Sequence, residues 1–405
     1  EEIRLAKKCY GWPEDAKFLV PESVGEHFSH NLGARGERLR SAWRELFEKY
    51  RAAHPDLAAE VDALLSGALP EGWDKDLPVF PADAKGLAGR DASQKALNAI
   101  AAKVPWLLGG SADLAPSTKT RLTFDGAGDQ SANDPGGRNF HFGIREHAMG
   151  AVMNGMAVSG LRAYGSGFLI FSDYGKAAIR LASLMEIPVV YVFTHDSIGV
   201  GEDGPTHQPI EQLAALRAIP GVITLRPADA NEVVEAWRFL MAQRREPVVL
   251  ALTRQAMPTL DRSRFAPASG LAKGAYVLAD STGGAPEVIL IGTGSEVAVC
   301  VGAHELLSAE GIRSRIVSMP SWELFEHQSA EYRESVLPRS VSARVSVEMG
   351  STLGWSRYVG LDGRAVGMTS FGASAPVGDL LKHFGFTKEA VAQAAREQVA
   401  AARRS

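Results

Sequence analysis

The sequence predicts an α/β protein with two domains built on parallel sheets, preceded by a helical linker. Short apolar segments, such as the near-continuous run at residues 187–195, alternate with segments of helical periodicity from about residue 87 onward. A continuous apolar run is typical of a strand that is buried on both faces of a parallel sheet. A polar stretch at residues 258–274 divides the alternating pattern in two. Alternation of this kind favours parallel strands joined by crossover helices.

The composition is that of a globular protein without a nucleic-acid or membrane partner. The 405 residues are 45% hydrophobic and 22% charged, and the net charge is -4, so no large basic surface is expected. Cys9 and Cys300 are the two cysteines, and they are too far apart to indicate a disulfide framework or a zinc knuckle. No apolar run reaches the roughly 18 residues of a membrane span, and the first residues lack the apolar core of a signal peptide. We therefore expect a cytoplasmic protein.

Residues 1–84 predict an inter-domain linker that contains a helix. Leucine and aromatic residues recur at helical spacing through residues 31–68. Segments rich in tryptophan and proline stand on both sides of that stretch. We interpret the region as a long linker that wraps the surface of a domain.

Residues 85–262 predict the first α/β domain. Its expected helices and strands alternate along the chain, and in order they cover residues 93–104, 104–110, 148–159, 161–168, 172–185, 187–195, 222–229, 230–244 and 247–254. Binding residues of such folds gather at the carboxyl ends of the parallel strands. His195 and Arg254 each follow a predicted strand, so both are candidates for a site at that edge.

Residues 272–405 predict a second, smaller α/β domain. Strands are expected near residues 287–292, 314–321 and 341–350, with helices at residues 297–310 and 388–402. The segment Gly-Thr-Gly-Ser-Glu at residues 292–296 follows a strand and begins a helix, which is also the arrangement of a phosphate-binding loop. We interpret it as tight packing of strand against helix, with anion binding as the alternative.

One carboxylate and three aromatic residues are the first chemical candidates. Glu146 stands at the start of a predicted helix, within Asn-Phe-His-Phe-Gly-Ile-Arg-Glu-His-Ala-Met. An acid at the start of a helix commonly stabilises the helix through a favourable interaction with its dipole. The alternative role is proton transfer to a bound ring. Phe168, Phe171 and Tyr174 recur three residues apart. Such a stripe is usually core, and the alternative is a stacking pocket for a flat heterocycle.

A loop with two histidines is the most specific signal. The segment Thr-His-Asp-Ser-Ile-Gly-Val-Gly-Glu-Asp-Gly-Pro-Thr-His-Gln-Pro contains His195, Asp203 and His207. A metal site is disfavoured because no cysteine or third histidine stands nearby. Histidine can donate hydrogen bonds near neutral pH, so the loop is instead a candidate substrate site.

Two lone arginines and a small-residue motif complete the candidates. Arg90 and Arg254 would ordinarily be surface residues, but a guanidinium group also suits a terminal phosphate. Asp113 and Ser117 belong to the motif Gly-Gly-Ser-Ala-Asp-Leu-Ala-Pro-Ser. That motif is either a simple turn after a strand or part of a site.

This order of one acid, an aromatic cluster and a loop rich in histidine and aspartate resembles transketolase, a family of thiamine diphosphate-dependent enzymes. The resemblance covers the pyrimidine-binding and C-terminal domains, from about Arg90 to the end of the chain. It implies transfer of a two-carbon ketol unit between ketose and aldose phosphates, with thiamine diphosphate and Mg²⁺. It also implies a homodimer, in which two subunits build each site. The pentose phosphate pathway and carbon fixation both stay open as the setting.

On the cofactor side, the resemblance assigns a role to five residues. Glu146 is the catalytic residue that protonates the aminopyrimidine ring. Phe171 stacks on that ring, while Phe168 and Tyr174 form walls of its pocket. Asp113 lies near the cofactor.

On the substrate side, the resemblance assigns phosphate binding, recognition of hydroxyl groups and contact with the reacting carbons. Asp203 binds a sugar hydroxyl and helps to select its configuration, and His207 is the second catalytic residue, near the reacting carbons. The phosphate-binding residues are Arg90, Ser117, His195 and Arg254.

One expected motif is missing from the sequence. These enzymes anchor the diphosphate and Mg²⁺ with Gly-Asp-Gly, which occurs nowhere in the chain. We therefore expect the N-terminal diphosphate-binding domain to be absent, no metal ligands in this chain, and a chain that is incomplete and inactive alone. A truncated enzyme is the preferred explanation. The alternatives are the second subunit of a split enzyme, the β subunit of a 2-oxo acid dehydrogenase, and a non-catalytic dimerisation or regulatory fragment.

Overall fold

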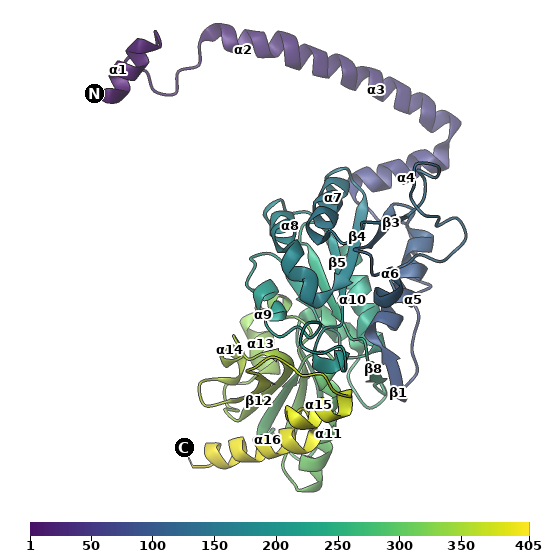
Figure 1. Ribbon diagram of the computed structural model, residues 1–405, viewed down its shortest axis with the longest axis vertical. Helices are drawn as coiled ribbons and strands as arrows, with labels where there is room; N and C mark the ends of the chain where they lie inside the picture. The colour runs from purple at the N-terminus through teal and green to yellow at the C-terminus, as the bar shows by residue number, and fades with distance from the viewer. Residues whose placement is uncertain (405) are drawn as a thin grey trace. The chain divides into compact units, whose positions relative to one another are not determined.

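The computed structural model describes residues 1–404, which form two compact units divided between Ala68 and Leu69 (Figure 1). The first unit is helical. Its elements are α1 (Glu2–Cys9), α2 (Glu22–Phe28), a π-helical turn (Ser29–Gly33), α3 (Ala34–Ala53) and α4 (Pro55–Ser66). Proline at the first position suits the start of α4, and Gly67 ends that helix with φ +68°. The predicted helical N-terminal region is confirmed.

The second unit begins with a six-stranded parallel sheet in the order β3-β2-β4-β5-β7-β6. The strands are β2 (Leu107–Ser111), β3 (Asn139–His141), β4 (Arg162–Phe168), β5 (Val190–Thr194), β6 (Ile223–Leu225) and β7 (Val248–Leu252). Every residue of β4, β5 and β7 is buried, as their apolar runs predict. The parallel α/β fold is confirmed.

Helices cover both faces of this sheet. They are α5 (Gly89–Lys103), α6 (Ala115–Thr118), α7 (Glu146–Val158), α8 (Ser172–Leu184), α9 (Gln212–Arg217) and α10 (Ala230–Ala242). Helices α7 and α8 pack together on one side and α5 and α10 on the other (Figure 1). A separate antiparallel pair joins β1 (Asp83–Ala88) to β8 (Ala256–Thr259).

A second sheet of five strands follows, in the order β13-β12-β10-β11-β9. Its strands are β9 (Tyr276–Asp280), β10 (Val288–Gly292), β11 (Ser314–Ser318), β12 (Arg344–Ser351) and β13 (Arg364–Met368). Only β9 is antiparallel to its neighbour. The sequence patterns predicted β10, β11 and β12 but neither β9 nor β13, which lie at the two edges and are less buried.

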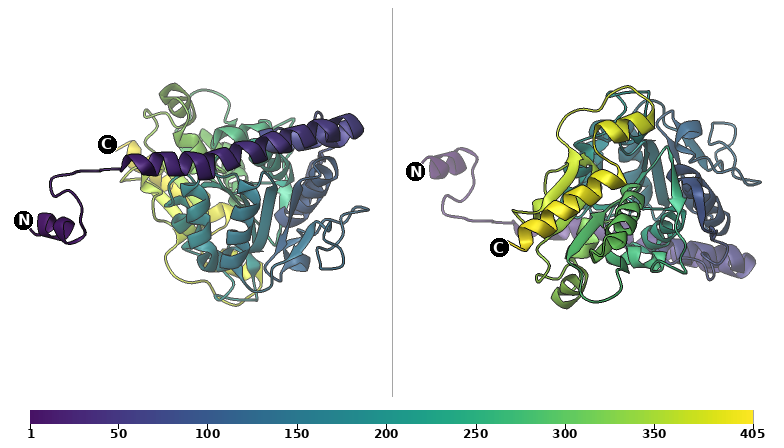
Figure 2. Two further views of the ribbon diagram at one scale, coloured as in Figure 1. Left: turned by 90° about the horizontal axis from the view of Figure 1, so that it is seen from above. Right: turned by 90° about the horizontal axis from the view of Figure 1, so that it is seen from below.

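The helices of this second region are α11 (Glu296–Ala309), α12 (Trp322–Glu326), α13 (Ala330–Val336), α14 (Ser356–Val359), α15 (Val377–His383) and α16 (Lys388–Ala402). Helices α11 and α16 lie side by side (Figure 2). Within residues 1–404, no helix combines the length and the apolar character that crossing a membrane requires.

The Gly-Thr-Gly-Ser-Glu loop holds an arginine of the protein itself. Arg226, which follows β6, is fully buried and donates hydrogen bonds to the carbonyl oxygen of Thr293 at 2.9 Å and to Glu296 at 2.8 Å. Gly294 has φ +59°, and a Cβ atom there would lie 2.7 Å from Cζ of Arg226. Of the two interpretations of this loop, tight packing therefore fits the structure, because the guanidinium group fills the space that an anion would need.

Candidate active site

Glu146 is the first residue of α7, directly after the loop that leaves β3. The side chain is buried, with 7% of its surface exposed. No residue of the described chain forms a hydrogen bond or ion pair with its carboxylate. Since the residue is largely enclosed and its carboxylate has no partner in the described chain, the carboxylate is free to accept a hydrogen bond from a ligand.

Two glycines bring the helices close to this acid. A Cβ atom at Gly165 of β4 would lie 2.1 Å from Sδ of Met153, so any larger residue there would displace the methionine side chains of α7. At Gly175 of α8, a Cβ atom would lie 3.7 Å from Cβ of Glu146. The first turn of α8, which carries Tyr174, is therefore beside Glu146.

The predicted aromatic residues and both histidines form one cluster. The rings of Phe168 and Phe171 stack with centroids 6.0 Å apart, and those of Phe171 and Tyr174 are 6.1 Å apart. The ring of His195 lies 3.8 Å from that of Phe168, and the ring of His207 lies 5.7 Å from that of Phe171. Phe168 is buried, whereas Tyr174 is 68% exposed. Tyr174 therefore lies at the open edge of the cluster.

His195 occupies a restrained position at the end of β5. Its backbone has φ +62°, which is unusual for a residue other than glycine. The side chain is buried, and Nδ1 lies 2.8 Å from Oγ1 of Thr194. Burial, together with the positive charges of Arg90 and Arg254 and the nearby His207, lowers the pKa of His195 to about 3.

We expect the His195 ring to stay neutral between pH 5 and pH 8. Its pKa in the folded protein is about 3, against an ordinary value of 6.5. The neutral ring therefore favours the folded state fully above about pH 6.5, and this contribution is lost as the pH falls toward 3. An NMR titration of the ring signals measures this, with exposed His383 as the internal control. A midpoint for His195 near pH 6.5 would contradict the burial and the charge arrangement.

Arg90 and Arg254 come together although they are far apart in the sequence. Arg90 lies in the first turn of α5, and its Nη1 donates to the carbonyl oxygen of Ser117 at 2.9 Å. Its Nε is buried without a partner in the described chain. Burial and the charge of Arg254 lower the pKa of Arg90, although Asp91 acts in the opposite direction. Two guanidinium groups placed close enough to repel each other indicate a binding site for an anion.

Three predicted residues lie nearer the solvent. Asp113 follows β2, is exposed and has φ +61°. Asp203 is exposed in the loop after β5, and Ser117 is half-buried in α6. The structure places all three in loops or a short helix at the same edge of the sheet, but it shows no protein partner for the carboxylates of Asp113 and Asp203 within residues 1–404.

Sequence patterns did not identify a buried cluster of hydroxyl groups beneath Ser117. Oγ of Ser166 lies 2.6 Å from Oγ1 of Thr120 and 3.1 Å from Oγ1 of Thr118. Oγ of Ser111 donates to the carbonyl oxygen of Ser166 at 3.1 Å. These bonds tie the end of β2 and α6 to β4. Serine and threonine in apolar surroundings were the available signal, because buried hydroxyl groups need partners.

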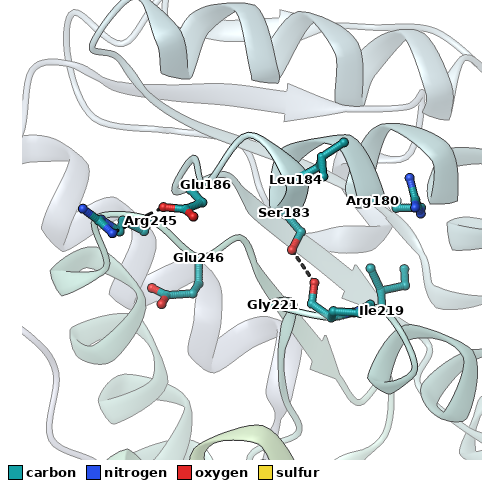
Figure 3. A pocket seen from close by; sticks show the side chains of 9 residues that line it. Arg180, Ser183, Leu184, Glu186, Ile219, Gly221, Arg245 and Glu246 are labelled. Atoms are coloured by element: carbon teal, nitrogen blue, oxygen red, sulfur yellow. Dashed lines mark hydrogen bonds and ion pairs between the residues drawn. The ribbon is translucent and has the colours of Figure 1, made fainter.

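A separate hollow of about 480 Å³ lies at the opposite end of the first sheet (Figure 3). Its lining includes Glu186, which precedes β5, and Arg245 and Glu246, which precede β7. Glu186 and Arg245 form an ion pair at 3.4 Å, and Oγ of Ser183 donates to the carbonyl oxygen of Pro220. Since these residues are at the amino ends of the strands, the hollow is not part of the predicted site.

The structure supplies no ready metal centre in its described part. No group of three or more histidine, cysteine, aspartate or glutamate side chains within residues 1–404 is arranged to hold a metal ion. The expectation that this chain binds no Mg²⁺ stays a prediction.

Comparison with family models matches most of the chain. The pyrimidine-binding domain of transketolase matches residues 85–259, and the transketolase-like C-terminal domain matches residues 274–387. The thiamine diphosphate-binding domain of transketolase matches residues 1–70.

Comparison with the sequences of known proteins also finds transketolases. The chain is 49% identical to a transketolase from Halalkalibacterium halodurans over 397 residues, which cover 98% of this chain and 59% of that protein. It is 48% identical to a chloroplastic transketolase from Craterostigma plantagineum, covering 98% of this chain and 76% of that protein. The chain thus spans about three-fifths of the first relative's length.

The fold of the chain is also similar to solved structures of transketolases. A transketolase from Pichia stipitis in complex with sedoheptulose 7-phosphate has a TM-score of 0.91 and 40% identity, covering 100% of this chain and 59% of that one. A structure described as a split-gene transketolase, an inactive β4 tetramer, has a TM-score of 0.62 and 25% identity, covering 78% of this chain and 99% of that one.

The match over residues 1–70 corrects one expectation. The N-terminal diphosphate-binding domain was expected to be absent, and that expectation is wrong, because these residues match the model of that domain. The expected absence relied on the missing Gly-Asp-Gly motif, whereas the linker was inferred from helical spacing between segments rich in tryptophan and proline. The region instead forms helices with large apolar side chains exposed, such as Leu39, Trp43 and Leu46 of α3. An amphipathic helix gives the same sequence pattern in a linker and at a domain surface. The related expectations of a truncated chain and of a pyrimidine half-site alone are likewise unsupported.

Proposed function

Because this chain belongs to the transketolase family, we propose that it acts in the transfer of a two-carbon ketol unit from a ketose phosphate to an aldose phosphate, with thiamine diphosphate and Mg²⁺. One observation carries the proposal. The unpartnered carboxylate of a largely enclosed glutamate, a cluster of aromatic rings and a pair of convergent arginines lie together at the carboxyl ends of one parallel sheet. Each group suits a different part of such a reaction.

The cofactor side of the site fits an aminopyrimidine ring. Glu146 would share a proton with the ring nitrogen N1′, because the residue is largely enclosed and its carboxylate has no partner in the described chain. Phe171 would stack on the ring, with Phe168 and Tyr174 at its sides and Asp113 nearby. When bound, thiamine diphosphate supplies the carbanion chemistry that cleavage of a carbon–carbon bond requires.

The substrate side fits a phosphorylated sugar. The residues that would bind the phosphate are Arg90, Arg254, Ser117 and His195, since neither guanidinium group forms an ion pair with a carboxylate within residues 1–404. His207 would donate to substrate oxygens beside the reacting carbons, because its ring packs against Phe168 and Phe171. Asp203, at the exposed tip of the loop, would accept a hydrogen bond from a sugar hydroxyl.

Replacing Arg254 by alanine tests the phosphate site. We expect KM for a ketose phosphate to rise by about 10- to 100-fold, the range for loss of a charge-assisted hydrogen bond. Turnover of the unphosphorylated ketose should not change. Arg245→Ala is the matched control, because Arg245 stands at the other end of the same strand. An equal loss with both substrates would remove Arg254 from phosphate binding.

Replacing Asp203 by alanine tests recognition of the sugar. We expect the preference between hydroxyl configurations to fall by about tenfold, with a smaller effect on kcat, because one hydrogen bond to a substrate hydroxyl is lost. Competition between two epimeric sugar phosphates measures the preference. Asp362→Ala, in a second exposed Asp-Gly segment, is the control. Unchanged selectivity would place Asp203 outside the substrate site.

A second copy of the chain is the proposed partner, beside the sugar phosphate substrates. Exposed apolar side chains lie on α7 at Val152 and Val158 and on α8 at Leu181 and Leu184. Large apolar patches of this kind mark interaction surfaces. Sedimentation analysis distinguishes a dimer from a monomer. Cytoplasmic location stays a prediction, because the relatives are both bacterial and chloroplastic.

The split-gene structure favours a second candidate arrangement, in which two different chains build one enzyme. That structure is matched over 99% of its length. Its TM-score of 0.62 is lower than the 0.91 of the Pichia stipitis enzyme, so the single-chain type is the preferred comparison. The subunit composition of the native protein distinguishes the two.

A further inference from the structure

The loop that carries His195, Asp203 and His207 is held by the C-terminal domain. We call residues 195–208 the histidine loop and residues 372–377, Gly-Ala-Ser-Ala-Pro-Val, the clasp. The clasp lies between β13 and α15 of the C-terminal domain. Although the two segments are distant in sequence, they meet through hydrogen bonds and through close contacts at three glycines.

Gln208 is the centre of this contact. Only 1% of its surface is exposed. Its Nε2 donates to the carbonyl oxygen of Gly201 at 2.8 Å and to the carbonyl oxygen of Ala373 at 2.9 Å. The first bond closes the turn that contains Asp203 and His207. The second bond fixes that closed turn to the clasp.

The clasp touches the turn at further points. Oγ of Ser374 donates to the carbonyl oxygen of Glu202. Gly201 and Gly204 have φ +84° and φ +78°, and Cβ atoms there would lie 3.1 Å from Val377 and 3.2 Å from Ser374. Both the backbone conformation and the close approach therefore require glycine on the loop side.

The near end of the loop is also attached to the C-terminal domain. Asp196 accepts a hydrogen bond from Nε of Arg226 at 2.9 Å, and Nη1 of the same arginine donates to Glu296 of α11. Ile198 is fully buried in a core cluster formed mainly by C-terminal residues such as Leu290 and Val297. Both ends of the loop are thus anchored, while Asp203 stays exposed at its tip.

We propose that Gln208 is a positioning residue that sets where Asp203 and His207 lie, and that the C-terminal domain acts on substrate recognition through the clasp. Gln208 touches neither the cofactor nor the substrate in this account, since its amide is directed at two carbonyl oxygens. The inference deepens the proposed function and rests on it for the identity of the substrate.

Two variants test the contact from opposite sides. Gln208→Glu keeps the shape of the side chain but removes both hydrogen-bond donors. Gly372→Ala places a Cβ atom 1.8 Å from Oε1 of Gln208, so the side chain must move. Gln328→Glu is the matched control, because its amide donates to one local carbonyl, that of Leu324 at 2.8 Å, far from the loop in sequence. Ser374→Ala is a milder variant should either of the first two fail to fold.

The first measurement is hydrogen–deuterium exchange of peptides covering residues 196–208 in the full chain. We expect exchange in both variants to be about tenfold faster or more, because the two hydrogen bonds that hold the loop are lost. The control should match the unaltered chain. The second measurement is steady-state turnover of fructose 6-phosphate, in which KM should rise more than kcat falls.

The outcomes separate the inference from the proposed function. Unchanged exchange in Gln208→Glu and Gly372→Ala would overturn the clasp, and so would equal losses in kcat and kcat/KM with KM unchanged. If the unaltered chain neither binds nor turns over fructose 6-phosphate, the proposed substrate is wrong. The exchange experiment still decides in that case whether the clasp holds the loop.

Discussion

Replacing Glu146 by alanine should lower turnover by about 10²- to 10⁴-fold, the range for removal of a proton-transferring group. The fold should stay intact, because no described residue depends on its carboxylate for a hydrogen bond. Steady-state turnover at saturating cofactor measures the loss, and the thermal unfolding midpoint verifies the fold. The loss should lie in kcat rather than in KM for the sugar phosphate, because the phosphate-binding residues are unaltered.

Glu389→Ala provides the matched control for this prediction. Glu389 also lies in the first turn of a helix, α16, and it is exposed. If the helix dipole alone explained an acid at such a place, both variants would lose a little stability and neither would lose activity. Turnover within about twofold of normal in Glu146→Ala would contradict the proton-transfer role and restore that simpler explanation.

Replacing Arg226 by methionine should cause the largest loss of stability. The guanidinium group is fully buried between Asp196 and Glu296, at 2.9 and 2.8 Å. Burial alone would lower the pKa of Arg226, but the carboxylates of Glu296, Asp196 and Glu348 outweigh burial and raise it. Removing the arginine leaves two buried carboxylates without their partner, which typically costs about 3–5 kcal/mol. We expect a clearly lower denaturant midpoint in urea unfolding.

Arg396→Met is the control that separates the effect of losing any ion pair from the effect of losing a buried one. Arg396 forms a two-bond pair with Glu310 at 2.7 and 2.8 Å, but at the surface, so its loss should shift the midpoint little. Adding Glu296→Gln to Arg226→Met should cost less than the two single changes together, because the second change removes an unpaired charge. Equal midpoints for Arg226→Met and Arg396→Met would contradict the account.

Local sequence patterns predicted the central part of the fold. The continuous apolar runs of β5 and β7 predicted strands that are buried on both faces of a parallel sheet. Both strands are indeed buried along their whole length. His195 and Arg254 lie at the carboxyl ends of those strands, as the rule for parallel sheets requires. The short edge strands β9 and β13 were missed because a partly exposed strand has no continuous apolar run.

The sequence alone could not show contacts between distant segments. Gln208 stands in the loop that the sequence singled out, but neither its partner Ala373 nor Glu296, the partner of Arg226, could be found from local sequence, because both lie in another domain. The family resemblance pointed to Arg90 and Arg254, whereas the charge effect between them depends on the folded sheet. Residues 1–70 were also misjudged, because a helical pattern occurs both in a linker and in part of a domain, and the missing motif was taken to exclude the diphosphate-binding domain.

The most direct test is a transfer experiment with fructose 6-phosphate that carries ¹³C at C1 and C2. The protein is supplied with thiamine diphosphate, Mg²⁺ and an aldose phosphate acceptor, and products are followed by NMR. The proposal predicts a new ketose phosphate in which both labels appear together at C1 and C2, and transfer that is at least about 100-fold slower in Glu146→Ala. Labels that stay in fructose 6-phosphate, although the protein has bound thiamine diphosphate, would contradict the proposed two-carbon transfer.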